Sequence, residues 1–296
     1  MTHRPALLAV LLALSVPLPA PAAPAKAPAR AAAKPLRAAK LTASQIVQKH
    51  VAARGGLKAW HDVQSMVWSG KMDVGYGDSI SRSEQWVGTV TSHKGKGPRM
   101  SPAEAKSAAR KQVQVPFVLE MKRPARSRVE IEFSGKRAVQ VYDGTSGWML
   151  RPFLNRDDWV PFTAEQAAQQ RGWELEDPLM DHAAKGTKVE LVSVDRVDGR
   201  DAYRLKLTRK GGEVRHVWID ARTFLDVKVE GAPRRMDGKL HTVWVTQRDF
   251  RPVHGLMVPF VLETAVDGFP DTHKVVVEKV ALNPRLDDGR FTKPRT

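Results

Sequence analysis

The strongest constraint on the fold of this chain is an apolar–charged alternation with a period of two residues. Val129, Ile131 and Phe133, for example, alternate with Glu130 and Glu132. Similar alternation occurs at residues 68–74, 117–122, 203–208 and 225–230. Successive side chains of a strand point to opposite faces, so this period predicts antiparallel strands with one face in the core and the other in water.

Turn dipeptides separate many of these stretches. They are Asp143-Gly144, Asp198-Gly199, Gly211-Gly212, Asp237-Gly238 and Asp267-Gly268. Gly supplies the positive φ that tight hairpins need, and Asp favours turn initiation. Hairpins that follow one another make a meander, and we expect about ten antiparallel strands that curl into a barrel or half-barrel. The predicted fold class is mainly β with some α.

Helix-start signals predict three α-helices around this sheet. A capping box at 42–45 is followed by apolar residues at helical spacing, which predicts a helix at 43–53 that stops at a Gly pair. A second capping box at 163–166 predicts a helix to Gly172, and Asp177-Pro178 predicts a third that ends at Gly186. A curved sheet must have its apolar face covered. We therefore expect the helices at 43–53 and 163–185 to cover this face, either over a packed core or as a short lid over a cavity.

The N-terminus has the three parts of a secretory signal. A basic start precedes an apolar run from Ala6 to Val16, and small residues follow as far as Ala25. We expect residues 1–25 to be a signal peptide, 26–41 a disordered basic linker and 42–296 a single domain. The chain contains no Cys, which excludes a lipid-modified cysteine, and we expect a soluble periplasmic protein without a lipid anchor.

The formal net charge of +16 favours acidic partners over basic ones. Most basic residues are scattered along the predicted strands, but residues 93–112 contain six Lys or Arg and one Glu. We expect this stretch to be a basic helical insertion that contacts an anionic membrane surface or an acidic protein partner. The alternative is a solubilising insertion without a partner. An exported protein seldom meets nucleic acid, so no nucleic-acid partner is predicted.

Catalytic motifs are lacking in the sequence. It has no GxSxG elbow, HExxH motif, P-loop or dinucleotide-binding Gly pattern, and its nine His are dispersed. Asp181-His182 is a pair of sequence neighbours, which do not face each other on a helix. Without Cys, zinc fingers and iron–sulfur clusters are excluded. We therefore predict a binding protein rather than an enzyme, with no catalytic residues, no cofactor and no metal.

The candidate binding residues are mainly aromatic, since the chain has eight Trp and three Tyr. Inward-facing aromatic residues would give an apolar cavity suited to acyl chains, and the alternative is that they fill a packed core. The predicted cavity lining consists of Trp68, Met72, Trp86, Phe117, Leu119, Trp148, Trp218, Trp244 and Phe260. The predicted lid or mouth consists of Phe153, Trp159, Phe162 and Leu179.

Several stretches in a fixed order resemble the outer-membrane lipoprotein-sorting (LolA-like) family of the bacterial periplasm. They are Gly-Gly-Leu-Lys-Ala-Trp at 55–60, Glu-Asp-Pro-Leu-Met-Asp-His at 176–182, Val-Asp-Gly-Arg-Asp-Ala-Tyr at 197–203, Trp-Ile-Asp-Ala-Arg-Thr-Phe at 218–224, Gly-Leu-Met-Val-Pro at 255–259, and Val-Ala-Leu-Asn at 280–283 before Phe291. The resemblance covers residues 42–294. It implies an unclosed β-barrel with an α-helical lid and an apolar cavity.

The resemblance also implies a function. In the family's carriers the cavity holds lipoprotein acyl chains, so we expect a soluble, monomeric periplasmic carrier or binder of lipidated proteins or lipids. The alternative is a sensor or interaction module of the same fold that recognises lipoprotein or lipopolysaccharide and signals to a protein partner. The insertion at 93–112 departs from the family pattern. Arg82, Arg126 and Arg128 are all candidates for the carriers' lid-latching Arg.

Overall fold

We describe the fold from a computed structural model. The structure describes residues 41–76, 112–152, 156–170, 175–236 and 238–293. The predicted signal peptide at 1–25, nearly all of the linker at 26–41 and nearly all of the basic insertion at 93–112 lie outside these ranges. So do two predicted site residues, Trp86 and Phe153.

The fold is dominated by one antiparallel sheet, as the two-residue alternation predicted. The sheet has 13 strands in the order β6-β5-β4-β3-β2-β1-β15-β14-β13-β10-β9-β8-β7. Their bounds are β1 (Ser65–Tyr76), β2 (Gln112–Lys122), β3 (Arg126–Phe133), β4 (Lys136–Tyr142), β5 (Gly147–Arg151), β6 (Arg156–Pro161), β7 (Lys188–Val197), β8 (Arg200–Thr208), β9 (Val214–Asp220), β10 (Asp226–Glu230), β13 (Val243–Val253), β14 (Leu256–Val266) and β15 (Thr272–Leu282). A separate hairpin pairs β11 (Arg234–Met236) with β12 (Lys239–His241).

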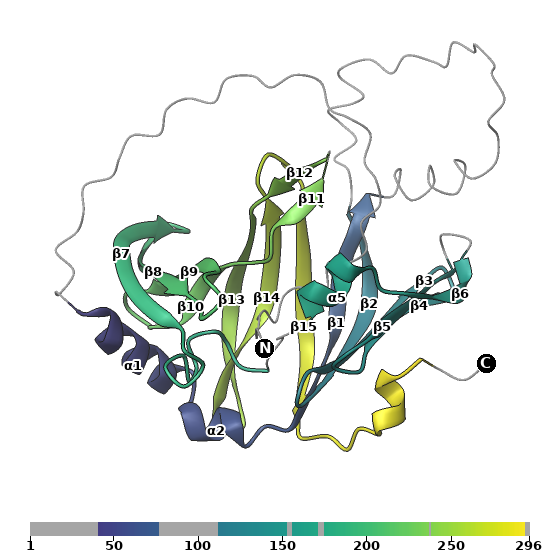
Figure 1. Ribbon diagram of the computed structural model, residues 1–296, viewed down its shortest axis with the longest axis horizontal. Helices are drawn as coiled ribbons and strands as arrows, with labels where there is room; N and C mark the ends of the chain where they lie inside the picture. Colours follow the sequence, from purple (N-terminus) through teal and green to yellow (C-terminus); the bar gives the residue numbers. More distant parts are fainter. Residues whose placement is uncertain (1–40, 77–111, 153–155, 171–174, 237, 294–296) are drawn as a thin grey trace, which may run out of the picture.

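The sheet is curved but not closed (Figure 1). Its two edge strands, β6 and β7, stand at opposite ends of the strand order. The expected number of about ten strands was too low. The additional strands are short, and some of them do not alternate: the last five residues of β4 are all buried, and β10 and β5 have five residues each. Such segments do not show the two-residue period.

The helices agree only in part with the prediction. Helix α1 (Ala43–Ala53) begins at the predicted capping box, in which Thr42 and Gln45 bind each other's backbone. It is followed by α2 (Leu57–His61), and later come α5 (Ala164–Gln170) and the 3-10 helix η3 (Asp288–Phe291). In the described part of the chain, no helix combines the length and apolar character needed to cross a membrane.

The helix predicted from Asp177 to Gly186 was wrong. The segment forms a series of turns instead. Asp177 accepts a hydrogen bond from the backbone N–H of Leu179 at 2.9 Å, a local turn that competes with a helix. Asp181 has a φ of 55°, which no helical residue adopts. A lid of two helices is therefore not present in the described residues. We call residues 175–186 the strap.

The strap lies between two apolar clusters on one face of the sheet, which we call the inner face. Leu175 and Met180 belong to the larger cluster, which packs on β1, β2, β3, β14 and β15. Leu179 belongs to the second cluster, in which α1 packs on β8 and β9. All three side chains are buried. The strap therefore packs into both apolar clusters of the inner face.

Candidate functional site

A pocket opens on the inner face beside the strap. Its cavity volume is about 50 Å³, and it opens to solvent. The apolar part of its wall consists of Trp68, Pro178, Leu207, Val217, Val229 and Pro259, and the polar part includes Arg54, Asp177, Asp226, Gln247, Arg209, Arg215 and Glu230. The pocket thus has an apolar wall with polar groups grouped around it.

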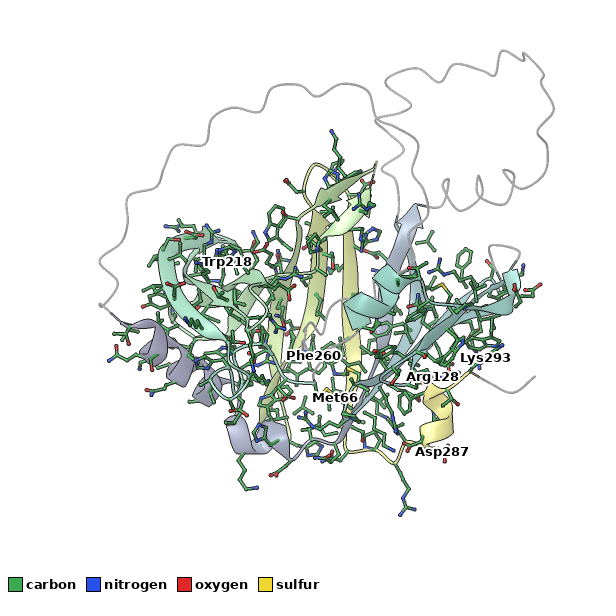
Figure 2. The ribbon with its side chains drawn as sticks, viewed as in Figure 1. Met66, Arg128, Trp218, Phe260, Asp287 and Lys293 are labelled. Carbon is green, nitrogen blue, oxygen red and sulfur yellow. The ribbon has the colours of Figure 1, made fainter. Side chains whose placement is uncertain are left out.

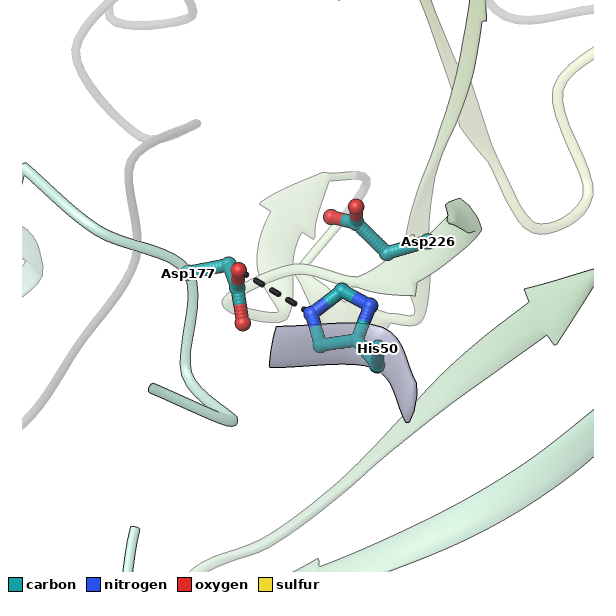
Figure 3. A group of neighbouring side chains, drawn as sticks. All are labelled: His50, Asp177 and Asp226. Atoms are coloured by element: carbon teal, nitrogen blue, oxygen red, sulfur yellow. Dashed lines mark hydrogen bonds and ion pairs between the residues drawn. The ribbon is translucent and has the colours of Figure 1, made fainter. Parts of the chain in front are cut away.

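Four charged residues meet at one end of this pocket, and we call them the buried ion cluster: His50, Arg54, Asp177 and Asp226. His50 Nε2 lies 3.1 Å from Asp177 Oδ2, and Arg54 Nε lies 3.5 Å from the same oxygen. Arg54 Nη1 lies 3.4 Å from Asp226 Oδ1. Figure 3 shows the His50 ring beside both carboxylates, with its contact to Asp177 drawn as a dashed line. All four residues are buried.

Local structure brings the four side chains together. His50 and Arg54 are four residues apart at the end of α1, so both side chains lie on one side of the helix. Asp177 belongs to the strap, where its turn with Leu179 fixes its carboxylate. Asp226 begins β10, opposite Ile219 of β9. The cluster therefore joins α1, the strap and the sheet.

His50 is held as a charged imidazolium by its surroundings. Its Nδ1 lies 2.9 Å from the carbonyl oxygen of Phe224, and its Nε2 faces Asp177. Both neighbours are acceptors, so both ring nitrogens must carry hydrogens to bind them. Burial opposes the charge, but the Asp177 carboxylate outweighs it and raises the pKa of His50 above its ordinary value.

The two carboxylates of the cluster have opposite pKa shifts. Burial opposes ionisation of Asp177, but the nearby His50 and Arg54 outweigh it and hold its pKa well below the usual range. Burial raises the pKa of Asp226, and repulsion from Asp177 adds to this, although Arg54 opposes it. Two cations and two carboxylates thus share a volume from which water is largely excluded.

The same cluster is a group of possible metal ligands. Atoms of His50, Asp177 and Asp226 lie within 4.8 Å of one another. However, the Arg54 guanidinium lies within 3.5 Å of both carboxylates and supplies the positive charge there. A metal ion would have to displace it, so the residues fit an ion-pair cluster better than a metal site.

Seven of the nine predicted cavity-lining residues fall into two groups on opposite faces of the sheet. Trp68, Met72, Phe117, Leu119 and Phe260 all lie in the larger inner-face cluster and are at most 7% exposed. They pack together as core, and of these five Trp68 lines the pocket. In Figure 2, Phe260 and Met66 lie near the middle of the sheet.

Trp218 and Trp244 lie on the outer face instead, which corrects their predicted place in the lining. Val217 and Ile219, which flank Trp218, pack against α1 on the inner face. Lys228 Nζ lies 4.7 Å from the Trp218 ring and 4.8 Å from the Trp244 ring. The strands that contain them, β9 and β13, carry apolar residues on both faces. The sequence alone therefore did not show which face each Trp occupies.

The remaining predicted residues lie in the other half of the sheet or in the strap. Trp148 is half-buried and alternates with the buried Gly147 and Met149 on β5. Trp159 and Phe162 are half-buried, and the Phe162 ring covers Gly147, where no Cβ would fit. Leu179 is fully buried in the second cluster. The structure does not bring these residues to the pocket.

Sequence reasoning did not find the buried ion cluster. One signal was present: His50 lies among Ile46, Val47 and Val51 on the apolar side of the first helix. A histidine in an apolar stripe must be buried, and a buried histidine needs polar partners. Those partners are more than a hundred residues away along the chain, so their identity could not be read from the sequence.

Comparison with known proteins gives a partial family match and several similar structures. The family described as "Peptidase propeptide and YPEB domain" (PepSY) matches residues 163–223, about a fifth of the chain. This range runs from the start of α5 through the strap to the end of β9. No curated protein sequence matches the chain.

Three solved structures are among those found to be similar to this chain. A DUF1329 family protein from Desulfovibrio piger has a TM-score of 0.51 and 11% identity, over 85% of this chain and 97% of that one. A LolA superfamily protein from Nitrosomonas europaea has a TM-score of 0.49 and 16% identity, over 86% and 98%. A putative outer membrane lipoprotein-sorting protein domain from Vibrio parahaemolyticus has a TM-score of 0.48 and 11% identity, over 83% and 94%.

Two of these structures carry the name of the family that the sequence resembles. The TM-score of 0.51 shows that the chain shares the fold of the DUF1329 family protein. At 11% identity that likeness concerns the fold alone: a large, unclosed antiparallel sheet with few helices.

Proposed function

We propose that this protein is a periplasmic carrier or binder that holds the acyl chain of a lipid or lipoprotein in the inner-face pocket. It acts by binding rather than by catalysis. The proposal is supported by the secretory signal that the sequence predicts at the N-terminus, the resemblance of residues 42–294 to lipoprotein-sorting proteins, and an open sheet with a pocket on its inner face.

The observation that carries the proposal is the shape and lining of this pocket. Val217 of β9 and Val229 of β10 form one apolar wall, and Trp68 lies on the side of the larger core cluster. Arg215 marks one end along β9, and Asp226, which pairs with Ile219, marks the other. Four strand residues span about 14 Å at ~3.4 Å each, so the lining residues follow β9 over about that length.

Burial of the acyl chain is favourable, and the free energy of binding depends on the length of the chain. Each CH₂ group that leaves water and enters an apolar site contributes about 0.8 kcal/mol, which is roughly a fourfold change in affinity. Affinity for single-chain amphiphiles should therefore rise steeply with chain length until the pocket is filled, and then level off.

The test compares a blocked pocket with a matched control. Val229→Trp places a large ring in the pocket from a half-buried position on β10. Thr246→Trp adds the same ring on β13. Thr246 is the neighbour of Gln247, which lines the pocket, so its own side chain points to the opposite face of the sheet. Binding of a series of alkyl amphiphiles with eight to fourteen carbons is measured by titration calorimetry.

We expect length-dependent binding by the wild-type protein and by Thr246→Trp, and at least tenfold weaker binding by Val229→Trp. Thermal unfolding checks that both variants remain folded. If Val229→Trp binds the whole series as the wild type does, the pocket is not the acyl site and the proposal fails.

A further inference from the structure

We propose that the inner end of the pocket binds an uncharged head group that both donates and accepts hydrogen bonds, such as an amide, at Arg54 and Asp226. This inference rests on the proposed function, since it concerns the polar end of the same acyl ligand. It specifies which class of amphiphile the protein selects.

The first observation is a set of hydrogen-bonding atoms that the protein does not satisfy. Among the described residues, Arg54 Nε and Nη1 and Asp226 Oδ1 have no hydrogen-bond partner. Their ion-pair distances of 3.4 Å and 3.5 Å bring charges together without hydrogen-bond geometry. Both residues line the pocket. Buried donors and acceptors are normally satisfied, so each unsatisfied atom requires a partner or a function.

The second observation is that these atoms are held in place. The Arg54 guanidinium lies between two rings, 5.0 Å from the Trp60 centroid and 5.5 Å from the Phe250 centroid. Asp226 Oδ2 accepts a hydrogen bond from Gln247 Nε2 at 2.9 Å, which leaves Oδ1 directed elsewhere. A donor set and an acceptor set therefore stand side by side with little freedom to reorganise, which favours a specific ligand group.

The third observation is the charge balance of the cluster. The imidazolium of His50 and the Arg54 guanidinium face the carboxylates of Asp177 and Asp226. A carboxylate head group can only accept, and it would meet two carboxylates. An ammonium head group can only donate, and it would meet two cations. An amide can accept from Arg54 through its oxygen and donate to Asp226 through its nitrogen, and it leaves the charge balance unchanged.

The test uses three probes that share a chain and differ in the head group: dodecanamide, dodecanoate and dodecylammonium. Each competes with a fluorescent acyl probe for the full mature protein at neutral pH. We expect dodecanamide to bind about tenfold more tightly than either charged probe, since it gains hydrogen bonds without adding charge.

The variant Asp226→Asn tests the role of charge, because it preserves the shape of the side chain and its contact with Gln247 but removes one negative charge. It should reverse the ranking, so that dodecanoate binds at least as tightly as dodecanamide. Asp198→Asn is the matched control: Asp198 is exposed at the β7–β8 turn, has a φ of 50° that Asn also tolerates, and should keep the wild-type ranking.

The outcomes separate the two proposals. If the three probes bind the wild type equally while affinity still depends on chain length, the head-group inference is overturned and the acyl-binding proposal stands. If none of them binds, the acyl-binding proposal itself fails. Should Asp226→Asn not fold, the ranking of probes on the wild type decides the question.

Discussion

His50 is a fully buried histidine whose two ring nitrogens both face oxygen acceptors. Its pKa is raised in the folded protein by Asp177 in spite of burial, which favours the charged form. Arg54 and Asp177 depend on it in turn, because removing one member of a buried ion cluster leaves the others without compensation. The chemistry of the pocket end is therefore set by a few side chains that are not exposed on the surface.

The raised pKa of His50 predicts a pH dependence of stability. A group with a raised folded pKa contributes stability that is fully present below its unfolded pKa, near 6.5, and is lost as pH rises through the folded value. We expect the urea midpoint of the wild type to fall as pH rises above about 6.5. His50→Gln should lower the stability by about 2 kcal/mol at pH 6 and flatten this pH dependence.

Asp226 also has a raised pKa, so its contribution changes with pH in the same direction. The difference in pH-dependent stability between the wild type and His50→Gln therefore isolates the contribution of the histidine. An unchanged pH profile in His50→Gln would show that His50 is not charged in the folded protein.

Among the elements, the strap is held by ion pairs to both sides of the molecule. Arg123, in the turn between β2 and β3, donates to Glu176 Oε2 at 2.7 Å, and Asp177 contacts His50 of α1. Burial opposes the ionisation of Glu176, but Arg123 outweighs it and lowers the pKa of that carboxyl. Leu175, Leu179 and Met180 then fix the strap against both apolar clusters.

We expect Glu176→Gln to destabilise the protein by about 1–2 kcal/mol, because it weakens a charge-assisted hydrogen bond at a buried carboxylate. Proteolysis under native conditions should cleave the strap faster in this variant. Glu278→Gln removes a carboxylate from an exposed pair with Lys71 and should change neither quantity measurably. Equal cleavage rates in the two variants would contradict an anchoring role for Glu176.

The joint between β1 and β15 is a second element on which the fold depends. The register of β1 shifts between Ser69 and Gly70, and a Cβ on Gly70 would collide with the backbone carbonyl of Val276. Gly70→Ala should therefore cost more than about 2 kcal/mol of stability, measured by urea unfolding. At Gly231 a Cβ would lie 3.5 Å from Val243, so Gly231→Ala should be nearly neutral. An unchanged stability of Gly70→Ala would show that β1 and β15 can move apart at this position without loss of stability.

At the scale of the whole molecule, much of the architecture could be predicted from the sequence. Alternation such as Val129–Phe133 predicted the antiparallel sheet, and the capping box at Thr42 predicted α1 with its observed bounds. The strap could not be predicted, because Asp177-Pro178 is also a helix-start signal and local turns decided the outcome. The side on which Trp218 lies depends on packing against α1, which no local pattern reports.

The charge of the molecule leads to a prediction of its own. The basic stretch at 93–112 is part of a chain with net charge +16, and we expect it to promote binding to vesicles that contain anionic lipid. Removing residues 93–112 should weaken this binding, and raising the salt concentration from 50 mM to about 500 mM should do the same because the charges are screened. Vesicle co-sedimentation measures both effects. Unchanged binding after the deletion would assign the contact to another surface.

The most direct test of acyl binding is native mass spectrometry of the protein purified from the periplasm without detergent, followed by lipid extraction. We predict a stoichiometric adduct that contains an acyl chain in the wild type and in Thr246→Trp, and its loss in Val229→Trp. A bare protein mass in all three, with no adduct after addition of lipid or lipopeptide, would contradict the account.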